Sequence, residues 1–244
     1  LVVVSDIHAG CQFGLCPMGG VVLDGGGQYT PSPSQKVTAQ WWDLFWGEWV
    51  PLVTREEPYV VAINGDAVDG RHHGSTTQVS QNLSDQIKIA HEILLPIRQN
   101  KMCAAMYIVR GTEAHVGQSA ETEEELAAGL DTVPDGSGNF SRNDLWMRIG
   151  PKTLVHLLHH VGTTSSSAHE ASAVNAEMTA EFVEAARWAC VAPDICVRSH
   201  RHRSISVEFD TARGYAIGVV TPGWQLRTPF AFKVAGGRIQ QPQF

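Results

Sequence analysis

The chain has 244 residues, of which 43% are hydrophobic and 18% are charged, and this composition is typical of a folded globular protein and excludes a disordered one. The length suffices for one sizeable α/β domain, so we expect residues 1–244 to form a single domain. The formal net charge of −7 argues against a general attraction to nucleic acid, so any affinity for anions must be local.

A strand and a tryptophan-rich helix are predicted first. The β-branched residues of LVVVSDIH, residues 1–8, indicate a buried strand. Residues 10–34 are rich in Gly, Pro and Ser and predict a long surface loop. Aromatic and aliphatic residues recur at helical spacing over 34–53, so we expect a helix whose four tryptophans pack in the core.

Two further pairs of strand and helix follow. YVVAINGD, residues 59–66, predicts a second strand, and 84–100 predicts an amphipathic helix with its first serine as N-cap. Residues 103–112 predict a third strand. Residues 119–130 predict a short acidic helix that opens on a capping box.

The rest of the chain predicts a hairpin, a long helix and several late strands. Residues 131–143 have the composition of a loop, and LWMRI with TLVHLLHH predicts a hairpin around Gly150 and Pro151. Residues 171–188 predict the third long helix. The late strands are expected at 194–202, 205–209 and 215–220.

Hydropathy and cysteine usage indicate a cytoplasmic protein. No apolar run approaches the ~20 residues of a membrane-spanning helix, and no signal peptide is visible. The five cysteines are odd in number and match no zinc knuckle or CxxC pair. We therefore expect reduced, mostly buried thiols and no association with a membrane.

Metal-binding side chains follow several predicted strands at their C-terminal ends, where ligand sites of open α/β sheets lie. Residues i and i+2 of an extended chain point to the same side, which would let each D-x-H or H-x-H pair grip one ion. Two carboxylates and several imidazoles suit Mn, Fe, Zn or Ni better than Ca or Mg. The side chains in question are Asp6 and His8, Asp66, His115, His159 and His160, and His200 and His202.

These motifs resemble those of the calcineurin-like metallophosphoesterase family in order and wording. That family carries D-x-H, G-D-x-x-D, G-N-H, a lone His and G-H-x-H; the chain has DIH at 6–8, GDAVDG at 65–70 and SHRH at 199–202. GTEAHVG, HHVGTTSSS and TPGWQLRTP are also similar to divergent members encoded by bacteriophages. The resemblance implies an α/β sandwich with two central mixed β-sheets flanked by helices. It also implies that the protein is located in the cytoplasm of a bacterium or of a phage-infected host.

The resemblance implies two divalent metal ions, each with its own ligands. The first ion would be held by Asp6, His8 and His202, and Asp66 would bridge both ions. The second would be held by His200 and the lone His. HHVG offers His159 or His160 for this lone His; the family's ligand sits at the strand end, which favours His159, and His160 would then face the substrate.

The third motif departs from the family. GTEAH stands at 111–115 in place of G-N-H, so the amide that usually binds the second ion is missing. Thr112 occupies its register, and Glu113 offers a carboxylate as another possible ligand. His115 would be the displaced catalytic histidine, which protonates the leaving group.

Arginines near the motifs are candidates for phosphate binding. Arg71 follows GDAVDG, where some family members place an Arg, and Arg201 and Arg203 flank the histidines of SHRH. Arg110, which precedes GT, could serve equally. Each could instead be a solvated charge or a partner of the surplus acids.

The function implied by the resemblance is hydrolysis of phosphodiester or phosphomonoester bonds through a dinuclear centre and a metal-bound hydroxide. A nuclease or nucleotide phosphodiesterase is an alternative; without a basic groove in the sequence, extended nucleic acid is disfavoured as a partner but nucleotides are not. A catalytically impaired metal-binding protein of the same fold is the other alternative, because Thr112 replaces the family's Asn. The sequence does not indicate an oligomeric state.

Overall fold

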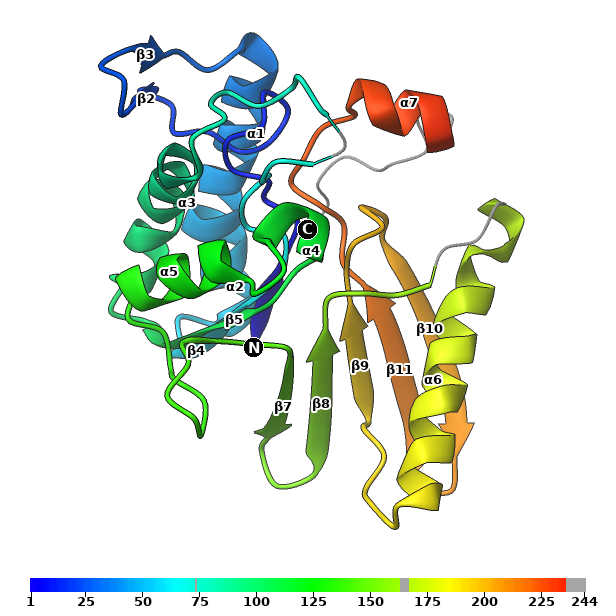
Figure 1. Ribbon diagram of the computed structural model, residues 1–244. Coiled ribbons are helices and arrows are strands. Elements are labelled where there is room, and N and C mark those ends of the chain that lie inside the picture. The colour runs from blue at the N-terminus through cyan, green and yellow to red at the C-terminus, as the bar shows by residue number, and fades with distance from the viewer. Residues whose placement is uncertain (73, 163–166, 236–244) are drawn as a thin grey trace.

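The computed structural model describes residues 1–72, 74–162 and 167–235 (Figure 1). Its first sheet has the strand order β1-β4-β5-β6, its second has the order β10-β11-β9-β8-β7, and β2 and β3 form a separate hairpin. The first sheet comprises β1 (Val2–Val4), β4 (Tyr59–Asn64), β5 (Cys103–Val109) and β6 (Ser141–Arg142). The second comprises β7 (Asp144–Ile149), β8 (Thr153–Leu158), β9 (Ile195–Arg198), β10 (Ile205–Thr211) and β11 (Gly214–Val220), and the hairpin pairs β2 (Val21–Val22) with β3 (Gln28–Tyr29).

Helices cover the outer faces of both sheets. Figure 1 shows α1, α3 and α5 beside the first sheet and α6 along the second. A small cluster of apolar side chains from β4, β5, β7, β8 and β9 fills the space between the sheets. The helices are α1 (Pro33–Leu44), α2 (Val50–Thr54), α3 (Leu83–Arg98), α4 (Glu113–Val116), α5 (Glu121–Gly129), α6 (Glu170–Arg187) and α7 (Pro229–Ala235).

The expected α/β architecture of two central sheets flanked by helices is confirmed, with one correction. The first sheet is wholly parallel and not mixed, because helical crossovers separate β1, β4 and β5. The second sheet is mixed, because the hairpin partners β7 and β10 add antiparallel strands at its two edges. No helix in the described ranges is long and apolar enough to cross a membrane.

The tryptophan-rich segment forms the expected helix with one irregular stretch. Residues Phe45–Trp49, labelled η1, form a π-helical turn between α1 and α2. Pro51 lacks the N–H that a regular helix needs at that position, which accounts for the break in the α-helical pattern. Trp42 is buried and meets the Trp224 ring edge-on at 4.8 Å, so its predicted place in the core is confirmed.

Two predicted helix starts were wrong. The N-cap of α3 is Asn82, whose side chain accepts from the backbone N–H of Ser84, so that Ser84 lies inside the first turn. No side chain caps α5: Ala120 holds a left-handed conformation there, and Glu121 accepts from the N–H of Ser119. Both differences shift a boundary by one or two residues and leave the helix itself in place.

The cysteines agree with the prediction of free, mostly buried thiols. All five are free, and four are buried. The exception is Cys190, which is exposed.

Candidate metal centre

The C-terminal ends of strands from both sheets converge at one edge of the molecule. Asp6 and Asp66 follow β1 and β4 of the first sheet, and Thr112 follows β5. His159 follows β8 of the second sheet, and His200 and His202 follow β9. Parallel strands deliver these side chains to a common edge, as the sequence predicted.

Asp6, His8 and His202 form a first group. Asp6 Oδ1 lies 3.2 Å from His202 Nε2, and His8 Nε2 lies 3.2 Å from the same nitrogen. Two imidazole nitrogens bound to one tetrahedral ion at about 2.0–2.1 Å are about 3.3 Å apart, close to the spacing between His8 and His202. Asp6 Oδ1 is buried without a hydrogen-bond partner, which is costly unless a cation completes the group.

Asp66, His159 and His200 form a second group. Asp66 Oδ2 lies 3.0 Å from His159 Nε2 and 3.9 Å from His200 Nδ1. Asp66 also groups with His8 and His115, with His115 Nε2 4.0 Å from the same oxygen. Asp66 therefore belongs to the second group and also lies within reach of His8 of the first group, as a bridging ligand would.

The structure corrects one geometric expectation. The sequence reasoning placed Asp6 with His8, and His200 with His202, on one side of an extended chain, but all four residues have φ between 47° and 68°. His200 joins the second group and His202 the first, so this pair does not grip one ion. Asp6 and His8 do lie together, through left-handed turns and not through an extended strand.

The histidines present defined nitrogens to the groups. His159 Nδ1 donates to the carbonyl oxygen of Asn64 at 2.7 Å, and Nε2 donates to Asp66 Oδ2 at 3.0 Å, so Nε2 is the nitrogen from which a bound cation would displace the proton. His8 Nδ1 donates in the same way to Asp69 Oδ1 at 3.2 Å. Such carbonyl and carboxylate partners are the ones that fix metal-binding histidines.

His115 is held by the same kind of contact. Its Nδ1 donates to the carbonyl oxygen of Asp69 at 2.6 Å, and Nε2 faces Asp66. Burial, opposed by the charge of Asp66 and reinforced by that of His8, lowers the pKa of His115 to about 4. The ring is thus neutral over most of the pH range, with an available lone pair on Nε2.

The carboxylates of the site are held ionised. Burial alone would raise the pKa of Asp6, but His202 and His159 outweigh it and lower the pKa to about 2. Asp66 is lowered well below its usual pKa in the same way, by His159 and His115 against burial. Conversely, Asp66 and Asp6 outweigh the burial of His159 and raise its pKa to about 10. The cluster is therefore built from anionic carboxylates and the imidazoles that they attract.

Close-packed glycines explain how the ligands approach one another. Gly65 has φ of 84°, and a Cβ there would lie 2.3 Å from His159 Nδ1. A Cβ on Gly111 would lie 2.2 Å from Asp66 Oδ1. Any side chain at either position would displace a candidate ligand.

A chain of short hydrogen bonds ends on the Asp6 carboxylate. Asn64 Nδ2 donates to Ser199 Oγ at 2.6 Å, and Ser199 Oγ lies 2.7 Å from Thr221 Oγ1. Thr221 Oγ1 lies 2.7 Å from Ser5 Oγ, which donates to Asp6 Oδ2 at 2.6 Å. One direction of donation, from Asn64 to Asp6, satisfies every link, and it leaves Asp6 Oδ1 as the atom that faces the first group.

The sequence reasoning missed Glu123, a buried acid beneath the site. Its Oε1 accepts from the N–H of Ala67 at 3.0 Å and its Oε2 from the N–H of Gly111 at 2.7 Å. It thereby joins the loop that carries Asp66 to the loop that carries Thr112. The helical spacing of α5 placed Glu123 in an acidic first turn but gave no sign of its partners.

Asp69, the second acid of GDAVDG, orients His8 and also accepts from Gln78 Nε2 at 2.8 Å. Burial would raise the pKa of Asp69, but hydrogen bonds from His72 and His8 outweigh it and lower the pKa. The position of Asp69 in GDAVDG, three residues after Asp66, was the sequence signal for a role at the site.

Thr112 and Glu113, the two possible extra ligands in GTEAH, differ in how close they lie to the second group. Thr112 Oγ1 lies 3.1 Å from His200 Nδ1 and 3.3 Å from Asp66 Oδ2, so it borders the second group. Glu113 is exposed and belongs to none of the groups formed by the described residues. The geometry therefore does not support Glu113 as a ligand.

His160 and Arg71 lie outside both groups. His160 is exposed, with its ring centroid 5.1 Å from that of His200, which puts it at the border of the second group. Arg71 is exposed, and its Nε donates to the carbonyl oxygen of Gln81.

The arginines around SHRH bind to α6. Arg198 is buried and pairs with Glu177 and Glu181. Arg203 pairs with Glu170, and Arg201 donates to the carbonyl oxygen of the same residue. Their interpretation as phosphate ligands is not supported, because acids and carbonyls of one helix hold them.

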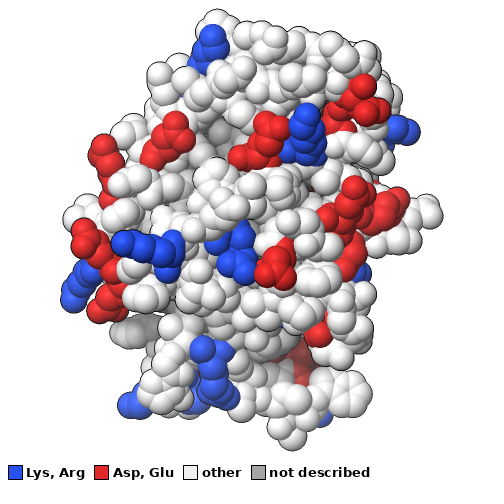
Figure 2. All heavy atoms as spheres, turned by 90° about the vertical axis from the view of Figure 1, so that its left-hand side faces the viewer, with Lys and Arg blue, Asp and Glu red and all other residues white. Residues whose placement is uncertain are grey.

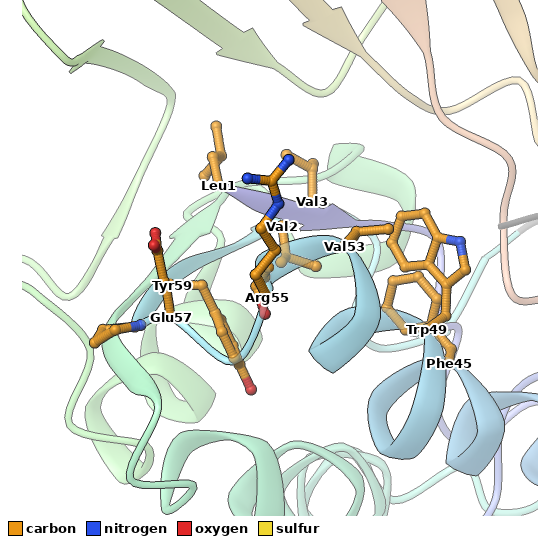
Figure 3. Close-up of a pocket in the computed structure, with 11 residues that line it drawn as sticks. Leu1, Val2, Val3, Phe45, Trp49, Val53, Arg55, Glu57 and Tyr59 are labelled. Carbon is orange, nitrogen blue, oxygen red and sulfur yellow. The ribbon is translucent and has the colours of Figure 1, made fainter.

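The cavity in Figure 3 lies away from both groups. Its volume is about 660 Å³, and Val2, Val3 and Tyr59 line it at the starts of β1 and β4. The candidate ligands follow the opposite ends of these strands. A smaller cavity of about 460 Å³ instead adjoins the second group, with Thr112 and His159 in its wall.

Comparisons with known proteins add limited information. No protein-family model and no curated protein matches the chain. A structure described as a predicted phosphoesterase from Streptococcus pneumoniae TIGR4 is similar, with 11% identity, a TM-score of 0.32 and coverage of 91% of this chain and 71% of that one. Vps29 from Entamoeba histolytica, complexed with Zn²⁺, is similar with 11% identity, a TM-score of 0.35 and coverage of 91% and 73%. Similarity at these values does not establish a family, so the resemblance rests on the motifs.

Proposed function

We propose that the protein is a metal-dependent hydrolase of phosphodiester or phosphomonoester bonds. The observation that carries this proposal is that Asp66 groups with His159 and His200 and also with His8, which belongs to the first group of candidate ligands. The buried Asp6 Oδ1, which lies 3.2 Å from His202 Nε2 without a well-aligned hydrogen bond, and the oriented imidazoles of His8 and His159 fit two divalent cations. The mixed carboxylate and imidazole donors suit Mn, Fe, Zn or Ni.

Two such ions would supply positive charge for a phosphoryl group and lower the pKa of a bound water from about 15.7 toward about 7. The protein's own groups then have separate tasks. Asp69 and the carbonyl of Asn64 hold His8 and His159 in the required tautomers. His115 presents Nε2 to the reacting region, where the lone pair of the neutral ring can serve as a further ligand. To act as a general acid, Nε2 would first have to take up the proton that it then gives to the departing alcohol. Arg71 and His160 remain proposed substrate contacts.

The net charge, together with the face drawn in Figure 2, gives no support for an extended nucleic acid as the substrate. Figure 2 shows acidic and basic side chains interspersed on the face that α1, α3 and α5 form, without a continuous basic stripe. With the net charge of −7, this face offers no track for a nucleic-acid backbone. Small phosphoesters, nucleotides included, need only the local charge of the site.

A catalytically impaired metal-binding protein is the competing function. Thr112 favours it, because a neutral hydroxyl is a weaker ligand than the amide that the family places there. Hydrolysis of bis-p-nitrophenyl phosphate with added Mn²⁺ separates the two: a protein that binds metal without turnover would favour the impaired form.

Replacement of the shared carboxylate tests the proposal. Asp66→Asn should lose bound metal and activity together, and the thermal stability gained from metal should fall, because the bridging charge serves both groups. Metal analysis, a phosphoester assay and a thermal melt measure these three effects. Asp131→Asn, a change at a side chain that is 89% exposed, is the matched control. Full metal content and full activity in Asp66→Asn would exclude the proposed site.

A further inference from the structure

The cavity beside the second group has the chemistry of a subsite for part of the substrate. Thr112 and His159 form the wall that it shares with the candidate metal ligands, and Gln118, Asn143 and His160 line it further out. A phosphoryl group at the metal centre would therefore have one ester substituent directed into this space of about 460 Å³. A phosphomonoester has no second substituent, so solvent would fill this cavity when a monoester is bound.

The charge of the subsite is close to balanced. Its lining includes Arg110 as the one basic side chain of Lys or Arg type, and Glu113 as an acid. The Arg110 guanidinium is already engaged: Nε donates to Ser141 Oγ at 2.9 Å, and a second nitrogen lies 3.5 Å from Glu124 Oε2. A second phosphate or another strongly charged substituent would thus find no free cation among the described lining residues.

Hydrogen-bonding groups are available instead. The side-chain amides of Gln118 and Asn143 are exposed and make no hydrogen bond within the described parts of the chain. Each amide offers two donors and an acceptor, which is the complement of alcohol hydroxyls. Among the described lining residues there is no Phe, Tyr or Trp, so the imidazole of His160 is the one exposed ring there on which a nucleobase could stack.

We propose that this cavity binds an uncharged, hydroxyl-rich ester substituent, the size of glycerol or a single sugar, and that the preferred substrate is accordingly a phosphodiester. The inference rests on the proposed phosphoesterase function. In the reaction, water adds to phosphorus, the bond from phosphorus to the departing alcohol breaks, and that alcohol leaves with a proton. The hydroxyl-rich group stays on the product phosphate within the subsite, and no electrons are exchanged with another reactant.

Three p-nitrophenyl phosphodiesters with the same leaving group test the subsite. Their second substituents are 2,3-dihydroxypropyl, propyl and thymidin-5′-yl. Two additional hydrogen bonds of about 0.5–1.5 kcal/mol each should give the dihydroxypropyl ester a KM about 10-fold lower than the propyl ester. Asn143→Ala and Gln118→Ala should each reduce this ratio severalfold.

Matched controls are Asn175→Ala on α6 and Gln40→Ala on α1, both exposed amides outside the cavity, which should preserve the ratio. Equal KM values for the dihydroxypropyl and propyl esters in the wild type would overturn the inference and leave the phosphoesterase proposal standing. Preference for the thymidinyl ester would overturn it in favour of a nucleotide.

Calorimetric binding of glycerol 3-phosphate and propyl phosphate to the metal-loaded protein separates the two proposals. Tighter binding of glycerol 3-phosphate that depends on Asn143 supports the subsite, even if no diester is hydrolysed and the phosphoesterase proposal fails. Equal binding of the two compounds, with or without turnover, overturns the subsite.

Discussion

Single residues at the site hold conformations that cost free energy. Asp6, His8, Asp66, His200 and His202 all have positive φ, which is uncommon for residues other than glycine. Strain of this kind costs of order 1–3 kcal/mol per residue and is found where function requires it. These five candidate ligands are half of the ten described residues other than glycine that have positive φ, so such backbone conformations are concentrated at the site.

The role of His115 can be determined by comparing substrates that differ in their leaving group. If Nε2 protonates the departing alcohol, His115→Ala should slow an alkyl phosphodiester by about 10²–10⁴-fold and a p-nitrophenyl ester much less, because p-nitrophenolate needs little protonation. If His115 is a ligand, the variant should lose one metal ion and both substrates should slow alike. Kinetics on the two substrates together with metal analysis distinguish these roles. Retention of both ions and of full activity on both substrates would leave His115 a structural residue.

Elements from the two sheets are connected directly beneath the candidate ligands. The hydrogen-bond chain from Asn64 to Asp6 joins the ends of β4, β9, β11 and β1. The hydrogen bonds of such a chain polarise and strengthen one another. All residues of this chain of hydrogen bonds except Thr221 are fully buried. The orientation of the Asp6 carboxylate thus depends on a residue of the opposite sheet.

Thr221→Val tests this dependence, because valine keeps the shape of threonine and removes the hydroxyl. Affinity for metal at the Asp6, His8 and His202 group should fall by about 10–100-fold, as for other changes to residues that orient ligands. Titration with Co²⁺ followed by absorption spectroscopy should show one weakened and one unchanged ion. Thr221→Ser should restore the affinity, and Thr179→Val on α6 is the control. An equal weakening of both ions, or none, would contradict the assigned role.

Periodicity predicted the existence of most elements but not their details. The β-branched runs before Asp6 and Asp66 and the apolar spacing of α3 and α6 are local properties, so the sequence reveals them. The cap of α3 and the π turn at Phe45–Trp49 depend on competing local hydrogen bonds, which spacing does not encode. The roles of Glu123 and Thr221 depend on residues far away in the chain, and no pattern near them indicates their partners.

At the scale of the whole molecule, the site lies where two sheets meet, and its ligands come from both. The motifs predicted which residues gather there because strand ends share an edge of each sheet. The resemblance also assigned His202 to the first ion and His200 to the second, whereas the extended-chain geometry put both on one ion, because it did not include the left-handed turns after β9. The extent of the domain over residues 1–244 and the identity of the metal remain predictions.

The free energy of unfolding should depend on pH through the ionisation of Glu123. Its pKa is raised to about 7, chiefly by burial and also by Asp66, against the hydrogen bonds from Ala67 and Gly111 that lower it. The folded protein therefore keeps a proton on Glu123 between its usual pKa of 4.5 and about 7, whereas the unfolded chain has lost it. Because the folded state binds more protons in this window, the free energy of unfolding should decrease as the pH rises from 4.5 through 7.

Glu123→Gln isolates this contribution, because glutamine fits the same space and does not titrate. The hydrogen bonds that glutamine loses shift the stability of the variant by an amount that does not depend on pH. The wild type should thus lose stability relative to the variant as the pH rises from 5 to 8, by up to ~3 kcal/mol for a shift of this size. Urea unfolding of both metal-free proteins at several pH values measures the difference. Since Glu123 holds the loops of Asp66 and Thr112 together, a stability difference that stayed constant across this range would mean that the carboxyl group ionises normally and that the two loops are joined by a charged group.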